Sequence, residues 1–444
     1  MNKWENTVLT KVADVKLSNV DKKYNKDEIE VRLCNYTDVY RNAYIDTNVA
    51  RTLMVASCNE REFEIFKLEE GQVAITKDSE TRDDIGVSTY ISESFDDVVL
   101  GYHTSLITPY PDKLSGKFLH YWLNTKQAKV YFENNAGGSG QRCTLPLDII
   151  KAVPLYLPPI KTQENIAAVF FNIDSKISLN NRNNAELEAM AKTIYDYWFV
   201  QFDFPFDFAQ GKPDKNGRSN EPTELKPYKS SGGKMVWNEE LKREIPEGWE
   251  VKPLDQLGII VGGSTPSREV DSYFCTEGIP WITPKDLSLN TGKKFIKRGE
   301  LDVTESGRSA ASLNILPRGT VLMSSRAPVG YLAIARNDVT TNQGFKSFVP
   351  KSHFTTEYLF YAIKNLLPVI ENNASGSTFK EVSGSVLKTI YSIAPNEEVV
   401  SSYTELVQTV FRRQELLEEE NQQLASLRDW LLPMLMNGQV TVKD

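Results

Sequence analysis

Two short loops, one in each half of the chain, combine small residues with a cation. They are Gly137–Arg142 and Gly376–Lys380, and each precedes a long polar pattern typical of a helix. Glycine and serine let a backbone approach a phosphate closely, and Gln141, Arg142 and Lys380 can reach phosphates or base edges. The chemistry that these loops indicate is nucleic-acid binding. For any single residue, a surface turn or a solvated charge is the alternative interpretation.

Further polar and aromatic residues in both halves are candidates for DNA contact. Those in the first half are Lys77, Arg82, Tyr90, Tyr102, His103, Ser139, Gln141 and Arg142. Those in the second half are Thr265, Ser267, Arg268, Lys285, Ser325, Arg326, Asn342, Gln343, Lys346, Ser377, Thr378 and Lys380. One sequence gives no register of loop residue to base, so it does not predict the bases that are read.

Signatures of catalysis are missing from the sequence. It has no GxxxxGK[ST] phosphate loop, no GxGxxG after a strand, and no Asn-Pro-Pro-aromatic or Asp-Pro-Pro-Tyr signature of amino-methyltransferases. The three histidines are dispersed, and the four cysteines form neither a CxxC pair nor a disulfide framework. A thiol pair of Cys143 with His103 is conceivable, but a packed or exposed cysteine is the simpler interpretation. We therefore expect no active site, no cofactor and no metal.

One spacing resembles that of a nuclease. Asp214, Glu224 and Lys226 match the PD-(D/E)xK pattern, whose carboxylates must be held rigidly on a sheet to bind Mg²⁺. Here they lie in a segment rich in Pro and Gly, which favours coincidence. A nuclease stays an alternative that requires Mg²⁺-dependent cleavage by this chain, lost on Asp214→Ala.

Composition is typical of a globular protein of two or three domains, with 40% hydrophobic and 25% charged residues among 444. No apolar run reaches the ~18 residues of a membrane span, and the start of the chain lacks the apolar core of a secretory signal, so we expect a cytoplasmic protein. The net charge of −8 argues against a uniformly basic nucleic-acid coat. Residues 1–150 hold 18 Lys and Arg against 23 Asp and Glu, whereas residues 246–395 hold 16 against 14. Any site for a polyanion is therefore local.

The two loops belong to a repeat with a period near half the chain length. Gly71–Ile75 and Gly319–Met323 stand at similar distances before them, and a long helical pattern follows each. Such a period indicates two diverged copies of one unit, a globular domain followed by a helix. Each copy is expected to be mixed, with short strands and one helix, near Lys117–Asn134 in the first and Thr356–Asn372 in the second. Two similar but non-identical units suggest a protein that holds two similar partners at a fixed separation.

The two long helical patterns repeat apolar residues at alternating spacings of four and three, which is the pattern of a coiled-coil seam. We predict that the helices pair antiparallel, since this brings the polar residues near the middle of each seam together and fixes the register. Two helices that each pack only on their own domain are the alternative. The central seam residues are Ile173, Ile177, Asn180, Asn184 and Leu187 in the first helix, and Val410, Arg413, Leu417, Glu420 and Leu424 in the second.

Several longer segments closely resemble type I restriction–modification specificity subunits, in the right order and over essentially the whole chain. They are Arg32–Tyr40, Tyr195–Phe199, Phe202–Pro205, Gly232–Trp237, Ile245–Trp249, Ile279–Leu287 and Leu427–Pro433. The resemblance implies an α+β fold with two target recognition domains, each reading half of a split DNA sequence, separated by two antiparallel helices that set the gap. It also implies a non-catalytic subunit that docks two modification subunits, which carry the S-adenosylmethionine, and that is joined by restriction subunits.

The domain boundaries follow from the repeat and the resemblance. We expect recognition domains at 1–158 and 246–395, helices at 159–200 and 396–432, a connector with aromatic anchors at 201–245, and a tail at 433–444. About 33 helical residues give a rod of roughly 50 Å, which spans about fifteen base pairs. The family's habit then suggests a spacer of roughly 5–8 base pairs. A stand-alone DNA-binding or scaffold protein that never engages a methyltransferase stays the alternative.

Overall fold

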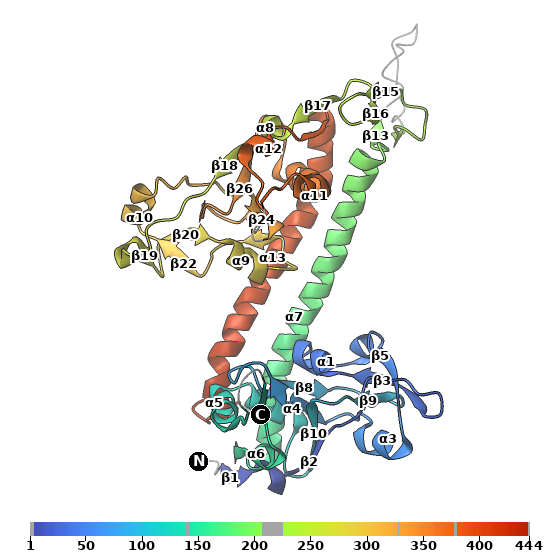
Figure 1. The fold of residues 1–444 in the computed structure, drawn as a ribbon, viewed down its shortest axis with the longest axis vertical. Coiled ribbons are helices and arrows are strands. Elements are labelled where there is room, and N and C mark those ends of the chain that lie inside the picture. The colour runs from blue at the N-terminus through green and yellow to red at the C-terminus, as the bar shows by residue number, and fades with distance from the viewer. Residues whose placement is uncertain (1–3, 139–141, 207–224, 327, 377–379, 443–444) are drawn as a thin grey trace. The chain divides into compact units, whose positions relative to one another are not determined.

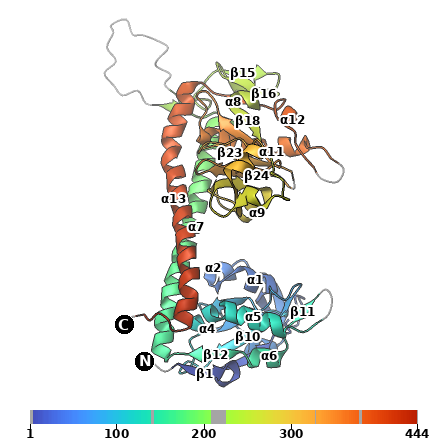
Figure 2. The same cartoon turned by 90° about the vertical axis from the view of Figure 1, so that its left-hand side faces the viewer.

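The computed structural model describes residues 4–138, 142–206, 225–326, 328–376 and 380–442. They form two compact units (Figures 1 and 2). Each unit has its own hydrophobic core. The first unit comprises residues 1–178 and 421–444, and the second comprises residues 179–420. Within the described ranges, no helix has both the length and the apolar character that crossing a bilayer requires.

The first unit is built on a five-stranded sheet of order β2-β10-β6-β8-β4 and a three-stranded sheet of order β5-β3-β9. The pairs β4–β8 and β3–β9 are parallel, and the other pairs in these sheets are antiparallel. Two small sheets, β1-β12 and β11-β7, complete the unit. Its strands are β1 (Glu5–Val8), β2 (Ala13–Leu17), β3 (Ile29–Cys34), β4 (Tyr44–Ile45), β5 (Met54–Cys58), β6 (Val73–Thr76), β7 (Asp78–Ser79), β8 (Ser88–Ile91), β9 (Val98–Leu100), β10 (Thr104–Pro109), β11 (Cys143–Thr144) and β12 (Pro154–Leu157).

Short helices connect these strands. They are η1 (Leu9–Lys11), α1 (Tyr36–Arg41), α2 (Thr47–Ala50), α3 (Glu60–Phe66), α4 (Gly116–Leu123), α5 (Lys126–Asn135) and α6 (Leu147–Lys151). The single helix expected over Lys117–Asn134 is two helices, so that prediction was wrong. The break lies at Thr125, whose side chain accepts a hydrogen bond from the Ala128 amide and begins α5.

The second unit repeats the plan of the first. Its five-stranded sheet has the order β18-β26-β23-β24-β21, with a four-stranded sheet β19-β22-β20-β25 beside it. The pairs β21–β24 and β20–β25 are parallel, as are β4–β8 and β3–β9 in the first unit. The predicted internal repeat is therefore confirmed in the five-stranded sheets, whose strands pair in the same order and the same directions. The strands are β13 (Pro205–Phe206), β14 (Lys226–Pro227), β15 (Met235–Asn238), β16 (Arg243–Pro246), β17 (Glu250–Pro253), β18 (Gly258–Gly262), β19 (Phe274–Cys275), β20 (Ile279–Ile282), β21 (Phe295–Ile296), β22 (Leu301–Val303), β23 (Val321–Ser325), β24 (Val329–Ala335), β25 (Thr340–Thr341), β26 (Lys346–Pro350) and β27 (Tyr391–Ala394).

The shorter helices of the second unit include α11 at the predicted place. The set is η2 (Asp196–Val200, a π-helix), α8 (Leu254–Leu257), η4 (Asp271–Tyr273), α9 (Pro284–Leu289), α10 (Glu305–Ala310), α11 (Thr356–Asn372) and α12 (Gly384–Leu387). The connector between the halves contributes two antiparallel strand pairs, β13–β14 and β15–β16. Its aromatic residues Phe202, Phe204 and Tyr228 are buried in the core of this unit together with Trp249.

Two long helices, α7 (Ile160–Tyr195) and α13 (Glu397–Met436), each contribute a segment to both units. In the second unit they run antiparallel, α7 in green and α13 in red in Figure 1. Asn180 Nδ2 donates a hydrogen bond to Glu420 at 2.8 Å, and Gln414 Nε2 donates to the Asn184 carbonyl at 3.3 Å. The predicted antiparallel pairing is therefore confirmed, and Asn180 meets Glu420 as the central polar residues were expected to meet.

The helix segments in the first unit are also antiparallel. Near the start of α7, Ile166 and Phe170 share a core with Leu435 and Met436 from the end of α13. One carboxylate, Asp174 on α7, accepts hydrogen bonds from Arg428 at 2.9 Å, Tyr121 at 2.8 Å and Tyr44 at 3.1 Å. This set of contacts joins both helices to the globular part of the first unit, and we call it the Asp174 cluster.

The buried face of α13 departs from the predicted seam. Arg413 is exposed, and its neighbour Gln414 is buried instead. An α-helix has 3.6 residues per turn, so a strict repeat of 3.5 drifts around a straight helix. In addition, α13 packs on globular parts of the protein as well as on α7. Its buried face is therefore wider than the seam of a two-helix coiled coil. Of the other predicted seam positions, Ile173, Asn180, Asn184, Val410 and Leu417 are buried. The remaining four, Ile177, Leu187, Glu420 and Leu424, are half-buried.

A buried ionic cluster holds the second unit's sheet against its helices. Lys294 is 4% exposed, and its ammonium contacts Glu188 of α7 at 2.6 Å and donates to Gln414 of α13 at 2.7 Å. Glu418 accepts hydrogen bonds from the backbone amides of Lys294 and Phe295, at 2.8 and 3.1 Å. Burial lowers the pKa of Lys294 to about 8 although Glu188 opposes the shift. Because separating a buried pair leaves an uncompensated charge, this cluster disfavours other orientations of the sheet on the helices.

Candidate nucleic-acid interface

The first site lies where β6 ends. There β7 pairs with β11, so that Asp78 faces Thr144 and Ser79 faces Cys143. The Lys77 amide donates a hydrogen bond to the His103 carbonyl at 3.0 Å, and Arg82 Nη2 approaches the Gly138 carbonyl at 3.5 Å. Three parts of the chain, residues 77–82, residues 102–103 and the described residues 137–138 and 142–144, therefore meet where β6 ends and β10 begins. The structure brings together the predicted candidates Lys77, Arg82, Tyr102, His103 and Arg142.

Asp78, which the sequence reasoning missed, stands at the centre of this site. Its side chain is 9% exposed and accepts hydrogen bonds from His103 Nδ1 and Thr144 Oγ1, with the Lys77 ammonium 3.4 Å away. Burial alone would raise the pKa of Asp78, but the bonds from Thr144 and His103 and the charge of Lys77 together lower it. The sequence offers one signal for Asp78, because this carboxylate stands between two predicted contact residues, Lys77 and Arg82.

His103 has an unusual backbone. Its φ is +68°, in the left-handed region that residues other than glycine rarely adopt. The imidazole packs against the ring of Tyr102 with centroids 4.0 Å apart, and Lys22 lies over that tyrosine ring at 5.8 Å. Such strain persists only where surrounding contacts enforce it, and it concentrates at functional sites.

The second site lies at the same place in the repeated fold. Arg326 follows β23 and pairs with Glu381, and Glu381 also pairs with Ser375. The Ser325 amide donates to the Gly344 carbonyl at 2.7 Å, as the Lys77 amide does to His103. The Val382 amide donates to the Ser325 carbonyl at 3.0 Å, as the Leu145 amide does to Lys77 at 2.7 Å. The two sites therefore share one backbone framework.

A fourth segment joins the second site. A Cβ at Gly263 would lie 2.1 Å from the Asn342 carbonyl oxygen and 2.3 Å from that of Thr341, so only glycine allows this approach. The close contact places Thr265 beside Gln343, and their side chains are hydrogen-bonded. Lys346, at the start of β26, and Lys380 lie on the adjoining segments.

The same capped helix flanks each site. Asn35 begins α1 and Thr283 begins α9, each in a capping box with an aspartate three residues later. Their strands are connected alike, since the Gly101 amide donates to the Cys34 carbonyl at 2.8 Å and the Asn342 amide to that of Ile282 at 3.0 Å. Lys285, in the first turn of α9, is exposed and ion-paired with Glu300 at 2.6 Å.

The remaining candidates fall elsewhere or outside the described residues. Ser325 is fully buried, and Ser267 and Arg268 are exposed in the segment that precedes η4. Ser139, Gln141, Ser377 and Thr378 lie outside the described residues, as do Asp214 and Glu224 of the nuclease-like spacing. Among the residues that the structure describes, no group of three or more His, Cys, Asp or Glu side chains is placed to hold a metal ion.

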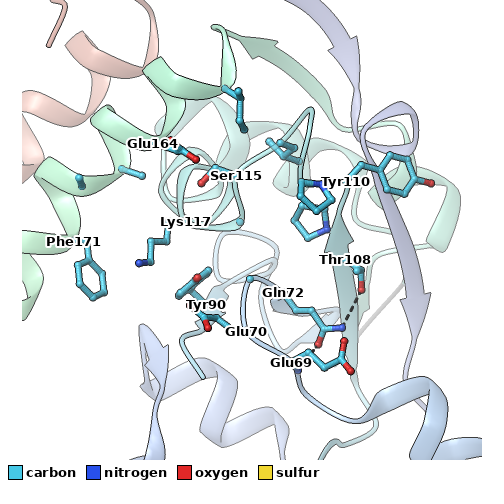
Figure 3. Close-up of a pocket in the computed structure, with 18 residues that line it drawn as sticks. Glu69, Glu70, Gln72, Tyr90, Thr108, Tyr110, Ser115, Lys117, Glu164 and Phe171 are labelled. Atoms are coloured by element: carbon cyan, nitrogen blue, oxygen red, sulfur yellow. Dashed lines mark hydrogen bonds between the residues drawn. The ribbon is translucent and has the colours of Figure 1, made fainter. Parts of the chain in front are cut away.

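Tyr90 lies apart from the first site. It is 4% exposed and lines a pocket of about 870 Å³ at the opposite ends of β6 and β10 (Figure 3). Lys117 lies over the rings of Phe171, at 4.4 Å, and Tyr90, at 5.6 Å. Three carboxylates, Glu69, Glu70 and Glu164, also line this pocket. Such a lining disfavours a phosphate backbone, so we leave Tyr90 out of the proposed interface.

Comparison with known families decides between a two-domain scaffold and a defined class of DNA-recognition protein. Residues 1–189 and 246–425 match the family model "Type I restriction modification DNA specificity domain". The chain belongs to this family. It is a DNA specificity subunit of a type I restriction–modification system, and hence a non-catalytic component of a restriction enzyme complex.

Relatives of the specificity subunit agree with this assignment. The chain is 40% identical over 199 residues to the type I restriction enzyme MjaIX specificity subunit of Methanocaldococcus jannaschii, a match covering 42% of this chain and 46% of that protein. It is 26% identical over 400 residues to the HindI specificity subunit of Haemophilus influenzae, covering 82% and 85%. The crystal structure of the S subunit from M. genitalium shares the fold, with a TM-score of 0.59 and 14% identity over 97% of this chain and 96% of that one.

Proposed function

We propose that each unit of this specificity subunit reads one half of a bipartite, asymmetric DNA target, and that the paired helices set the unspecified spacer between the halves. The observation that carries the proposal is the duplicated site. One backbone framework occurs twice and presents different side chains, Asp78 and His103 in the first unit, Arg326 and Gln343 in the second. Two related sites with different polar side chains are suited to recognise two different base sequences.

The partners in this proposal are two modification subunits, which carry the S-adenosylmethionine, and restriction subunits that join the complex in the cytoplasm. The charge of this chain supports a DNA interface that it shares with the modification subunits. The rim of the first site holds Glu80, Asp83 and Asp84 as well as Arg82, and the whole chain carries a net charge of −8. Phosphate neutralisation dominates affinity for DNA, so much of the positive charge must come from the modification subunits.

The test is to express the chain with its modification subunit in a host that lacks restriction–modification systems, and to map modified adenines across the genome. We expect a motif with two specified halves and a constant unspecified gap. Arg326→Ala should relax one or more positions within a single half, because an arginine commonly reads guanine in the major groove. Arg308→Ala removes the same charge from α10, where Arg308 pairs with Glu305, and should leave the motif unchanged.

A continuous motif, or relaxation of both halves by Arg326→Ala, would contradict the proposed division of labour. A soluble complex that adds no methylation would favour the scaffold alternative instead.

A further inference from the structure

The histidine and carboxylate of the first site define a hydrogen-bonding direction. An ionised carboxylate only accepts hydrogen bonds, so the bond between Asp78 and His103 Nδ1 requires a proton on Nδ1. Asp78 also accepts from Thr144 Oγ1 and lies beside Lys77, contacts that favour its ionised form. In the neutral imidazole, Nε2 then has no proton and is a hydrogen-bond acceptor.

The orientation of this ring is fixed before any ligand binds. The His103 backbone is held at φ +68°, its carbonyl accepts from the Lys77 amide at 3.0 Å, and its ring packs against Tyr102. The side chain is 25% exposed, and no hydrogen bond to Nε2 is found within the described part of the chain. A ring that is oriented in advance and still accessible suits recognition at low entropic cost.

We propose that His103 Nε2 accepts a hydrogen bond from the exocyclic amino group of one base, and that Asp78 positions the imidazole for this contact. This inference rests on the proposed function. In the major groove, adenine N6 and cytosine N4 donate hydrogen bonds, whereas guanine O6 and thymine O4 only accept. The first unit therefore requires adenine or cytosine at one position of its half-site and discriminates against guanine and thymine there.

The second unit has no counterpart of this pair. Gly344 stands at the position of His103, because its carbonyl accepts from the Ser325 amide as that of His103 does from Lys77. Arg326 occupies the place of Asp78, since it pairs with Glu381 as Asp78 pairs with Thr144. The effect of the His103–Asp78 pair is thus confined to one half of the target.

The experiment uses the full complex of this chain with its modification subunit. Motifs are mapped by genome-wide methylation, and methylation rates are then measured on duplexes with each of the four bases at every position of the half-site. For the native complex, one position should favour adenine or cytosine over guanine and thymine by about tenfold or more. His103→Ala should make that position degenerate and leave the other half unchanged.

Asp78→Asn separates positioning from structural support. A carboxamide can both donate and accept, so it no longer fixes the imidazole tautomer. The same position should widen to include guanine or thymine, while every other position keeps its base. Asp14→Asn, an exposed carboxylate of β2 paired with Lys16, removes the same charge from the same unit and should change nothing.

Three outcomes overturn the inference. They are an unchanged motif in both His103→Ala and Asp78→Asn, a uniform loss of rate in Asp78→Asn with no change of base preference, and no position favouring adenine or cytosine in the native complex. If His103→Ala abolishes methylation, the Asp78→Asn profile decides. Failure of the proposed function would look different, because the native complex would then give no bipartite motif.

Discussion

Asp174 links the globular part of the first unit to both of its helix segments. Its side chain is 12% exposed and accepts from Arg428, Tyr44 and Tyr121. Asp174→Ala would remove the one carboxylate that Arg428, Tyr44 and Tyr121 share, so we predict a loss of about 3 kcal/mol of stability in the first unit. Hydrogen exchange in peptides of β6 and β10, measured by mass spectrometry, reports this loss.

A matched control removes the other carboxylate beside Arg428. Asp429 is 67% exposed and lies 3.0 Å from the same guanidinium, and exposed pairs contribute little. Asp429→Ala should leave exchange in β6 and β10 within about 0.5 kcal/mol of the native value. Equal protection in both variants would mean that the Asp174 cluster does not hold this unit together.

The stability of the second unit should depend on pH through the carboxyl group of Glu188. Burial would raise its pKa, but the charges and hydrogen bonds of Lys294 and Lys364 lower it from 4.5 to about 2. A depressed carboxyl pKa contributes stability above pH 4.5 that is lost as the pH falls toward 2. The stability difference between the native chain and Glu188→Gln should therefore shrink by about 2 kcal/mol between pH 6 and pH 3.

Urea unfolding followed by circular dichroism at the two pH values measures this difference, and the other carboxyl groups cancel because both chains contain them. Glu186→Gln, an exposed carboxylate on the same helix, is the control and should show no such change. A Glu188→Gln effect of equal size at pH 6 and pH 3 would show that the ion pair does not titrate as described.

The long helices are the elements that give the molecule its proposed measuring function. Inserting four residues after Asn181 would lengthen α7 by about 6 Å, which corresponds to at most about two base pairs. We predict that the methylated motif keeps both halves and gains one or two base pairs of spacer. The same four residues inserted after Glu240, in the turn between β15 and β16, should leave the spacer unchanged.

Genome-wide mapping of modified adenines for the two insertions gives the answer directly. An unchanged spacer in a complex that still methylates would show that α7 does not set the distance between the half-sites.

For the molecule as a whole, the repeat, the mixed fold and the antiparallel helices could be predicted from the sequence, because recurring motifs and the periodic spacing of apolar residues indicate them. Helix α11 was expected at its observed bounds, since its apolar residues follow a helical repeat without competition. The break at Thr125 was missed, because one capping side chain outweighed a continuous pattern. Gln414 was missed since burial on α13 depends on what it packs against, and sequence spacing does not contain that information.

The candidate interface was predictable only in part for the same reason. The loops Gly137–Arg142 and Gly376–Lys380 were recognised from their composition, but their neighbours were not. Asp78, Thr144 and Glu381 enter the two sites through strand pairings between segments more than fifty residues apart. Tyr90 was a reasonable candidate by type, yet it lies on β8 opposite the start of β6, and one sequence cannot show which strand ends meet in the fold.

The proposed function requires that each unit reads its own half of the target. The most direct test replaces residues 1–158 with the corresponding domain of a family member of different specificity, and maps methylation by the complex with the native modification subunit. We predict a hybrid motif in which one half changes, while the other half and the spacer length are retained. A motif in which both halves change, or neither, in a complex that still methylates would contradict it.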